Sequence, residues 1–220
     1  MQYRDFGNSG KKLPLLGFGC MRLPVLEDDK TIDEAAAQKM VDYALANGVN
    51  YFDTAYTYHH GESEAFLGRA LSRYPRDSYY LASKLPIWYI KSEEDVHKYF
   101  DGQLKKCQTD YFDFYLMHNY SAESAQTGEQ IGIYDILKQK QREGKIRHLG
   151  FSTHDSLEGL AHVASLHEWE FAQLQLNYMD WDLLHSREQY ELLTKKNIPV
   201  IVMEPVRGGA LATLNEGARE

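Results

Sequence analysis

Cysteine is scarce in this sequence, and it contains no long apolar run. Two cysteines, Cys20 and Cys107, are too few for a disulfide framework or for a metal site built from cysteine. No apolar run reaches the length of about 18 residues that a membrane-spanning helix needs. The N-terminal segment MQYRDFGNSGKK also lacks the apolar core of a signal peptide. We therefore expect a cytoplasmic protein.

Positive charge is also in deficit, because 32 acidic residues outweigh 24 basic ones and leave a formal net charge of −8. A protein that binds nucleic acid or a membrane surface usually presents a basic face, so the sequence favours neither partner. Hydrophobic residues make up 43% of the chain and charged residues 25%, which is typical of a globular protein. With no linker or low-complexity tract, we expect residues 1–220 to form a single domain.

What the sequence does contain is an alternation of short apolar runs with amphipathic segments. The runs are rich in β-branched and aromatic residues and are bounded by Gly, Asn or Pro, as strands are. They cover residues 15–20, 49–54, 79–85, 112–118, 147–153, 171–177 and 198–204. The segments between them predict helices at about 31–47, 63–73, 92–107, 134–143, 156–167 and 186–197. Thr31 with Glu34, and Ser186 with Gln189, have the spacing of capping boxes.

Strands that alternate with helices at this spacing predict parallel strands joined by crossover helices. A doubly wound sheet that binds a dinucleotide at its first turn would carry G-x-G-x-x-G there. This turn instead reads GFGCMRLP, with Pro24 and no third glycine. We therefore predict an α/β fold of the (β/α)8 TIM-barrel type, because polar residues end many different strands, as on the active face of a barrel: Asp53, Lys84, His118, Ser152, Asn177 and Glu204.

The barrel is expected to be incomplete. Residues 2–16 read as a β-hairpin that turns at Gly7-Asn8-Ser9-Gly10 and covers the barrel floor. A barrel of eight units averages about 250 residues, whereas this chain has seven candidate strands and six candidate helices. We expect the eighth strand and the final helices to be lacking, so that the strands at 15–20 and 198–204 keep unpaired apolar edges. Such edges promote self-association.

The stretch YFDTAYTYHH, at residues 51–60, carries the most informative chemistry. Asp53 ends an apolar strand, where a carboxylate is costly to desolvate without a partner cation. Lys84 ends the next strand and is the natural partner. A cation close to Tyr58 would lower the pKa of the phenol from about 10 toward neutrality. Tyr58 would then be a general acid for a carbonyl oxygen, and His118 would orient that oxygen.

These residues resemble the catalytic tetrad of the aldo-keto reductases. FDTAYTYHHGESEAFLGRAL is similar to the signature of that family, and so are GFGCMRLP and HLGFST to its first and fifth strands. The resemblance implies a (β/α)8 barrel that reduces an aldehyde or ketone with NADPH, or with NADH as the alternative. In its terms Tyr58 is the acid, Asp53 and Lys84 tune it, and His118 positions the small carbonyl substrate.

The same resemblance implies a cofactor site. Ser152 and Gln173 match positions that bind the nicotinamide carboxamide, and Thr153 stands where asparagine is usual. Met203 occupies the place of an aromatic ring that stacks on the nicotinamide, and Glu204 follows it. Arg207, with the two glycines after it, either cradles the pyrophosphate or belongs to a frayed chain end. MEPVRGGAL is similar to a subgroup whose full-length members carry a C-terminal iron–sulfur-type extension.

Three other interpretations of these residues remain open. Asp53 and Lys84 on their own would suit a purely structural ion pair. A metal site would unite Asp53, His59, His60 and His118, although the His-x-His that such barrels place on the first strand is absent from LLGFGC; we expect no metal. The third alternative is a non-catalytic binding or regulatory protein that keeps a reductase fold.

Overall fold

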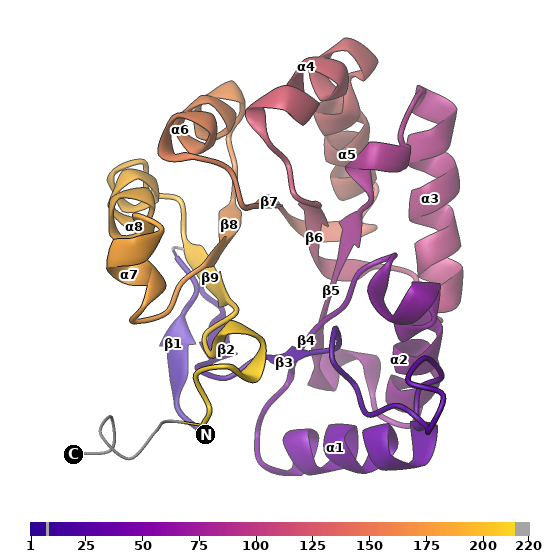
Figure 1. Cartoon of the computed structure of the whole chain (residues 1–220). Helices are drawn as coiled ribbons and strands as arrows, with labels where there is room; N and C mark the ends of the chain where they lie inside the picture. Colours follow the sequence, from indigo (N-terminus) through magenta and orange to yellow (C-terminus); the bar gives the residue numbers. More distant parts are fainter. Residues whose placement is uncertain (8, 214–220) are drawn as a thin grey trace, which may run out of the picture.

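A single parallel sheet forms the centre of the molecule. The computed structural model describes residues 1–7 and 9–213, and in it seven strands pair in chain order. The sheet curls on itself, and the helices lie around its outside (Figure 1). The incomplete TIM-barrel fold predicted from the sequence is thereby confirmed. The strands are β3 (Phe18–Gly19), β4 (Tyr51–Asp53), β5 (Tyr80–Leu85), β6 (Phe112–Met117), β7 (Ile146–Thr153), β8 (Phe171–Gln175) and β9 (Val200–Met203).

The first strand of this sheet is shorter than its sequence suggests. Only two of the six residues in LLGFGC form β3, and Leu15 and Leu16 are exposed. Within the described residues, β3 pairs only with β4, and β9 pairs only with β8. Both edges of the sheet are therefore unpaired in the described part of the chain, as the strand count predicted.

The N-terminal hairpin precedes the sheet and is antiparallel. It consists of β1 (Tyr3–Asp5) and β2 (Lys12–Pro14). Its predicted turn is present at Gly7, Ser9 and Gly10, whereas Asn8 lies outside the described residues. Phe6 packs edge-on against Phe114, with ring centroids 5.1 Å apart, and closes the inside of the curled sheet.

Eight helices are present in the described part of the chain, two more than predicted. Helices α4 and α7 were not predicted, because α4 has few large apolar residues and α7 is a single turn. The bounds are α1 (Glu34–Ala46), α2 (Ser63–Leu71), α3 (Glu93–Lys106), α4 (Ala122–Ile131), α5 (Ile133–Arg142), α6 (Leu157–Leu166), α7 (Asp180–Leu183) and α8 (Ser186–Lys195).

Both predicted capping boxes are wrong. Asp33 caps α1 by accepting from the Ala36 N–H, while the Thr31 hydroxyl donates to Asp28 instead. Helix α8 follows His185, a left-handed residue without a side-chain cap, and the Ser186 hydroxyl donates to the carbonyl of Gln175. In neither case does the hydroxyl oxygen accept from an N–H in the first turn of the helix.

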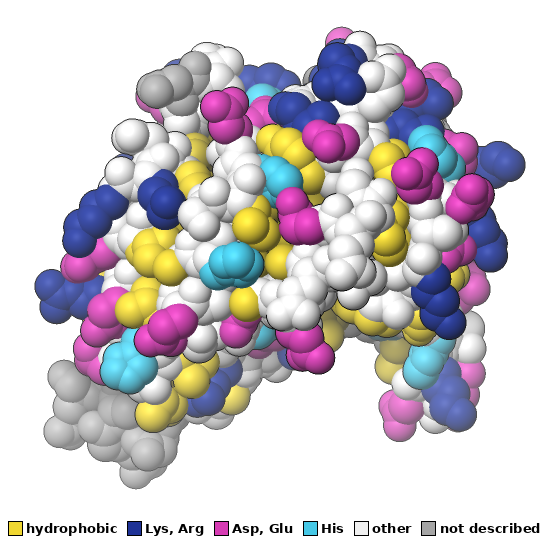
Figure 2. All heavy atoms as spheres, turned by 90° about the horizontal axis from the view of Figure 1, so that it is seen from above, with side chains coloured by type: hydrophobic (Ala, Val, Ile, Leu, Met, Phe, Trp, Pro, Cys, Tyr) yellow, Lys and Arg dark blue, Asp and Glu magenta, His cyan; other side chains and the backbone are white. Residues whose placement is uncertain are grey.

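The surface is mixed in character. Figure 2 shows acidic and basic side chains interspersed over one face, with hydrophobic side chains between them. Within residues 1–7 and 9–213, no helix combines the length and the apolar character that a bilayer crossing requires.

Candidate active site

The inner face of the sheet positions the candidate site. One buried cluster contains only strand and hairpin residues, among them Ala82, Leu116 and Phe171, so it lies on the face turned away from the helices. Side chains alternate between the two faces of a strand. Counting two residues onward from Tyr51, Ala82, Leu116, Phe171 and the adjoining Ile201 therefore leads to inner residues close to the carboxyl ends of their strands: Asp53, Lys84, His118, Gln173 and Met203. Ser152 lies directly opposite Gln173 and shares this face.

A glycine allows the strands to approach at this level. Gly150 lies opposite Phe171 in the register of β7 and β8. A Cβ atom on Gly150 would lie 2.5 Å from the Phe171 carbonyl oxygen and 2.7 Å from its ring. No larger residue fits there without moving the strand that carries Ser152.

Lys84 is the centre of the site. Its side chain is 1% exposed, and its ammonium donates to Asp53 Oδ1 at 2.5 Å, to the Thr54 carbonyl at 2.9 Å and to the Tyr58 hydroxyl at 3.2 Å. These three bonds use all three of its donors. Asp53 and Tyr58 raise the pKa of Lys84 although burial opposes its charged form. The predicted contact of Lys84 with both Asp53 and Tyr58 is present.

The protonation of Tyr58 differs from the expectation. Burial of the phenol is the largest influence on its pKa and raises it, while Lys84 acts in the opposite direction. The net shift is upward, not down toward neutrality. The phenol therefore carries its proton at neutral pH, which is the state a general acid requires.

His118 lies beside the phenol. Its ring centroid is 6.0 Å from that of Tyr58 and 5.0 Å from that of Trp88. Burial, and secondarily Lys84, lowers its pKa to about 3. The imidazole is therefore neutral at ordinary pH and carries one N–H. Its Nδ1 is buried without a hydrogen-bond partner in the described structure.

Sequence reasoning missed a polar network behind Lys84. Ser63 Oγ donates to the Cys20 carbonyl and lies 2.8 Å from Thr54 Oγ1. Glu64 accepts from Ser83 and Gln103, and Gln103 also donates to the Lys84 carbonyl. All of these side chains are fully buried. The start of α2 thus fastens together the strand ends that carry Asp53 and Lys84.

A signal for this network was available in the sequence. Glu64 lies on the same helix face as Leu67 and Leu71, where a charged residue is unusual. Burial raises its pKa above the ordinary range for glutamate. A buried acidic residue on an apolar helix face needs partners, but the sequence cannot say that Ser83 and Gln103 supply them.

Ser152 and Gln173 lie together next to Asp53. They are directly opposite each other in the register of β7 and β8. Gln173 Nε2 donates to Asp53 Oδ2 at 3.1 Å, while its Oε1 is buried and has no partner in the described structure. Ser152 Oγ accepts from the Asn119 N–H, which leaves its own proton free to donate. A donor and an acceptor are therefore available side by side.

The other predicted cofactor residues are placed differently. Thr153 follows Ser152 and so faces away from Gln173; it is buried and its hydroxyl accepts from the Asp155 N–H. Met203 lies opposite Gln175 on the inner face. Glu204 and Arg207 are both left-handed residues of the loop after β9. Glu204 pairs with Arg22 at 3.6 Å, and Arg207 pairs with the buried Asp180 at 3.7 Å.

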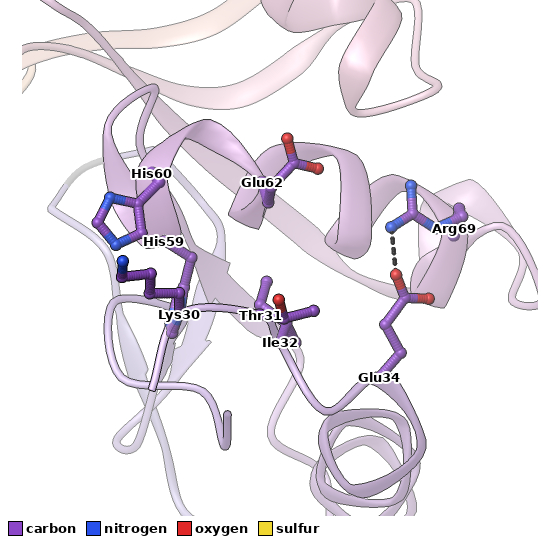
Figure 3. Close-up of a pocket in the computed structure, with 8 residues that line it drawn as sticks. All are labelled: Lys30, Thr31, Ile32, Glu34, His59, His60, Glu62 and Arg69. Carbon is purple, nitrogen blue, oxygen red and sulfur yellow. Dashed lines mark hydrogen bonds and ion pairs between the residues drawn. The ribbon is translucent and has the colours of Figure 1, made fainter. Parts of the chain in front are cut away.

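A separate cavity of about 290 Å³ lies between the loop before α1 and the start of α2. Figure 3 shows Lys30 and His60 at one side of it and the Glu34–Arg69 ion pair at the other. His59 also lines it, and His59 Nε2 accepts from the Leu23 N–H at 2.9 Å. This contact fixes the turn that follows Tyr58. No group of three or more His, Cys, Asp or Glu suited to a metal occurs within the described residues.

Comparison with known proteins identifies the family. Residues 15–220 match the model of the aldo/keto reductase family. The chain belongs to this family. Its fold agrees: an aldo-keto reductase from Bacillus halodurans, solved in its holo form, superposes with a TM-score of 0.78 at 26% identity over 99% of this chain and 71% of that one.

The curated relatives are longer than this chain. A probable aldo-keto reductase of Glycine max is 27% identical over 92% of this chain and 59% of its own length. The L-galactose dehydrogenase of Arabidopsis thaliana is 33% identical over 69% of this chain and 48% of its own. The chain thus spans about half to three fifths of the length of these two relatives.

Proposed function

We propose that the protein reduces a small aldehyde or ketone to an alcohol at the expense of NADPH, with Tyr58 as the general acid. The observation that carries this proposal is the position of Lys84, whose ammonium bonds to both Asp53 and the Tyr58 hydroxyl. A structural ion pair alone would not need a half-buried phenol on the same ammonium, beside a neutral imidazole.

Each tetrad residue then has one task. Tyr58 gives its hydroxyl proton to the carbonyl oxygen as that oxygen becomes an alkoxide. Lys84 donates to the phenolate that remains and so stabilises it. Asp53 keeps Lys84 charged inside the protein. Neutral His118 donates its single N–H to the same carbonyl oxygen and fixes its direction.

The residues present fit a nicotinamide. Its carboxamide needs one acceptor and one donor, and the orphaned Gln173 Oε1 and the free proton of Ser152 supply them. When bound, the reduced nicotinamide supplies the hydride that adds to the carbonyl carbon. Met203 would pack against its ring. Arg207, which pairs with Asp180 in this structure, is the candidate contact for the phosphates, and NADH is the alternative cofactor.

The test is the NADPH-dependent reduction of a panel of aldehydes. The rate is measured as the loss of absorbance of the reduced nicotinamide. Tyr58→Phe should lower kcat by about 10²-fold or more, as loss of a general acid does. Tyr56→Phe is the matched control, because Tyr56 is two residues away and packs on Tyr99 rather than on Lys84. Equal rates for the wild type and Tyr58→Phe would remove Tyr58 from the chemistry.

A further inference from the structure

The two oxygens of the Asp53 carboxylate have different partners. Oδ1 accepts from Lys84 at 2.5 Å, and Oδ2 accepts from Gln173 Nε2 at 3.1 Å. Gln173 lies 120 residues further along the chain, on β8. The side chain of Asp53 can rotate only if one of these bonds is broken. Gln173 therefore fixes the plane of the carboxylate that holds Lys84.

The Gln173 amide is itself used at one end only. It is 4% exposed, and its Oε1 has no partner in the described structure. A buried amide oxygen without a partner is costly, so this atom is available to a ligand. One amide group thus contacts Asp53 with its nitrogen, while its oxygen has no partner among the described residues.

We propose that Gln173 is a positioning residue, which orients Asp53 and sets how much of the Asp53 charge reaches Lys84 and Tyr58. Through the same planar amide, a carboxamide that donates to Oε1 strengthens the hydrogen bond from Nε2 to Asp53. The second part rests on the proposed nicotinamide cofactor, whereas the first part concerns the protein alone.

The physical reason is that Lys84 and Gln173 both bind the single negative charge of the Asp53 carboxylate. A hydrogen bond from Gln173 withdraws charge from Asp53, and a donor on Gln173 Oε1 polarises the amide and strengthens that bond. Asp53 acts to raise the pKa of Tyr58, and Lys84 acts to lower it. Cys20 and His118 are the other titratable groups that face the phenol. Without the Gln173 donor, Asp53 presents more charge and the phenol holds its proton more tightly.

The experiment reads Tyr58 in the cofactor-free protein, by NMR of tyrosine labelled with ¹³C at the ring carbon that bears the hydroxyl. The signal of Tyr58 is the one missing from Tyr58→Phe. Gln173→Met should move the titration of this signal to higher pH, because it removes the donor to Asp53 at similar side-chain length. Gln173→Glu, which puts a second carboxylate beside Asp53, should move the titration further and serves if the first variant fails to fold.

Ser152→Ala is the matched control. It removes the other candidate carboxamide contact without touching Asp53, so the titration of the Tyr58 signal should stay in place while NADPH affinity falls. Both Gln173 variants should also lower kcat by about tenfold, whereas Ser152→Ala should act on the cofactor Kd. A Tyr58 titration that does not move in either Gln173 variant overturns the proposal. Because this signal is read without cofactor, failure of NADPH binding in the wild type would count against the proposed function instead.

Discussion

Removal of the Lys84 ammonium is the most informative perturbation of this molecule. Lys84→Met keeps most of the side-chain volume and deletes three hydrogen bonds, to Asp53, Thr54 and Tyr58. The Asp53 carboxylate then remains with Gln173 as its one partner among the described residues. A surface lysine would be replaced at almost no cost, so the outcome depends on how deeply the pair is buried.

The Lys84–Asp53 pair is buried deeply enough that the loss of one partner should cost much of the free energy of unfolding. The side chain of Lys84 is 1% exposed and that of Asp53 is 14% exposed. Removing one partner of a buried ion pair costs about 3–5 kcal/mol, because the other charge stays behind without compensation. That loss is a large fraction of the 5–15 kcal/mol by which a typical domain is stable. Removing both charges is far less costly, so Asp53→Asn combined with Lys84→Met should recover at least about half of it.

Urea denaturation of the wild type, both single variants and the double variant measures these differences. Lys12→Met is the control, because Lys12 pairs with Asp5 at the surface with 66% and 70% of the side chains exposed, and such pairs contribute at most about 1 kcal/mol. A Lys84→Met cost as small as that of Lys12→Met would refute a desolvated tetrad. If the double variant recovers none of the stability lost in Lys84→Met, the unpaired charge of Asp53 is not the cause of that loss.

Three further predictions concern pH and assembly. Burial raises the folded-state pKa of Glu64, so the contribution of Glu64 to stability is full below the unfolded pKa of about 4.3 and is lost as pH rises through the folded pKa. Glu64→Gln should therefore have a higher melting temperature than the wild type at pH 8 and the same melting temperature near pH 4. Equal melting temperatures at both pH values would contradict this. Because the pKa of His118 is about 3, the rate profile should show no His118 inflection near 6.5, and one that disappears in His118→Gln would contradict the buried neutral imidazole. The unpaired edges of β3 and β9 should make the chain self-associate at micromolar concentration, and a concentration-independent monomer in light scattering would contradict that.

The strands, and the contacts of Lys84 with Asp53 and Tyr58, were predictable because they depend on local pattern and on a general rule. An apolar run that ends in Asp53 or Lys84 identifies a strand and its carboxyl end, and adjacent parallel strands bring those ends together. The sequence therefore predicted the contact of Asp53, Lys84 and Tyr58 correctly. The inner position of Ser152 and Gln173 follows from the same alternation of side chains.

The predictions that were wrong or missing depended on three-dimensional contacts and burial, which the sequence does not show. Thr31 has the spacing of a helix cap, but Asp33 caps α1, and the Thr31 hydroxyl donates to Asp28 instead. The pKa of Tyr58 was expected to fall because Lys84 is near, yet burial outweighs the cation. The contact between Gln173 and Asp53 joins residues far apart in the chain, and only the curvature of the sheet brings them together.

The central claim is that Tyr58 protonates a carbonyl oxygen while hydride arrives at the carbon. The most direct measurement is mass spectrometry of the alcohol formed from an aldehyde and NADPH that carries deuterium at the reactive nicotinamide carbon. The account predicts one deuterium on the carbinol carbon of the product, formed by the wild type and by Tyr56→Phe and at least about 10²-fold more slowly by Tyr58→Phe. An alcohol without deuterium, or one formed equally fast by Tyr58→Phe, would contradict it.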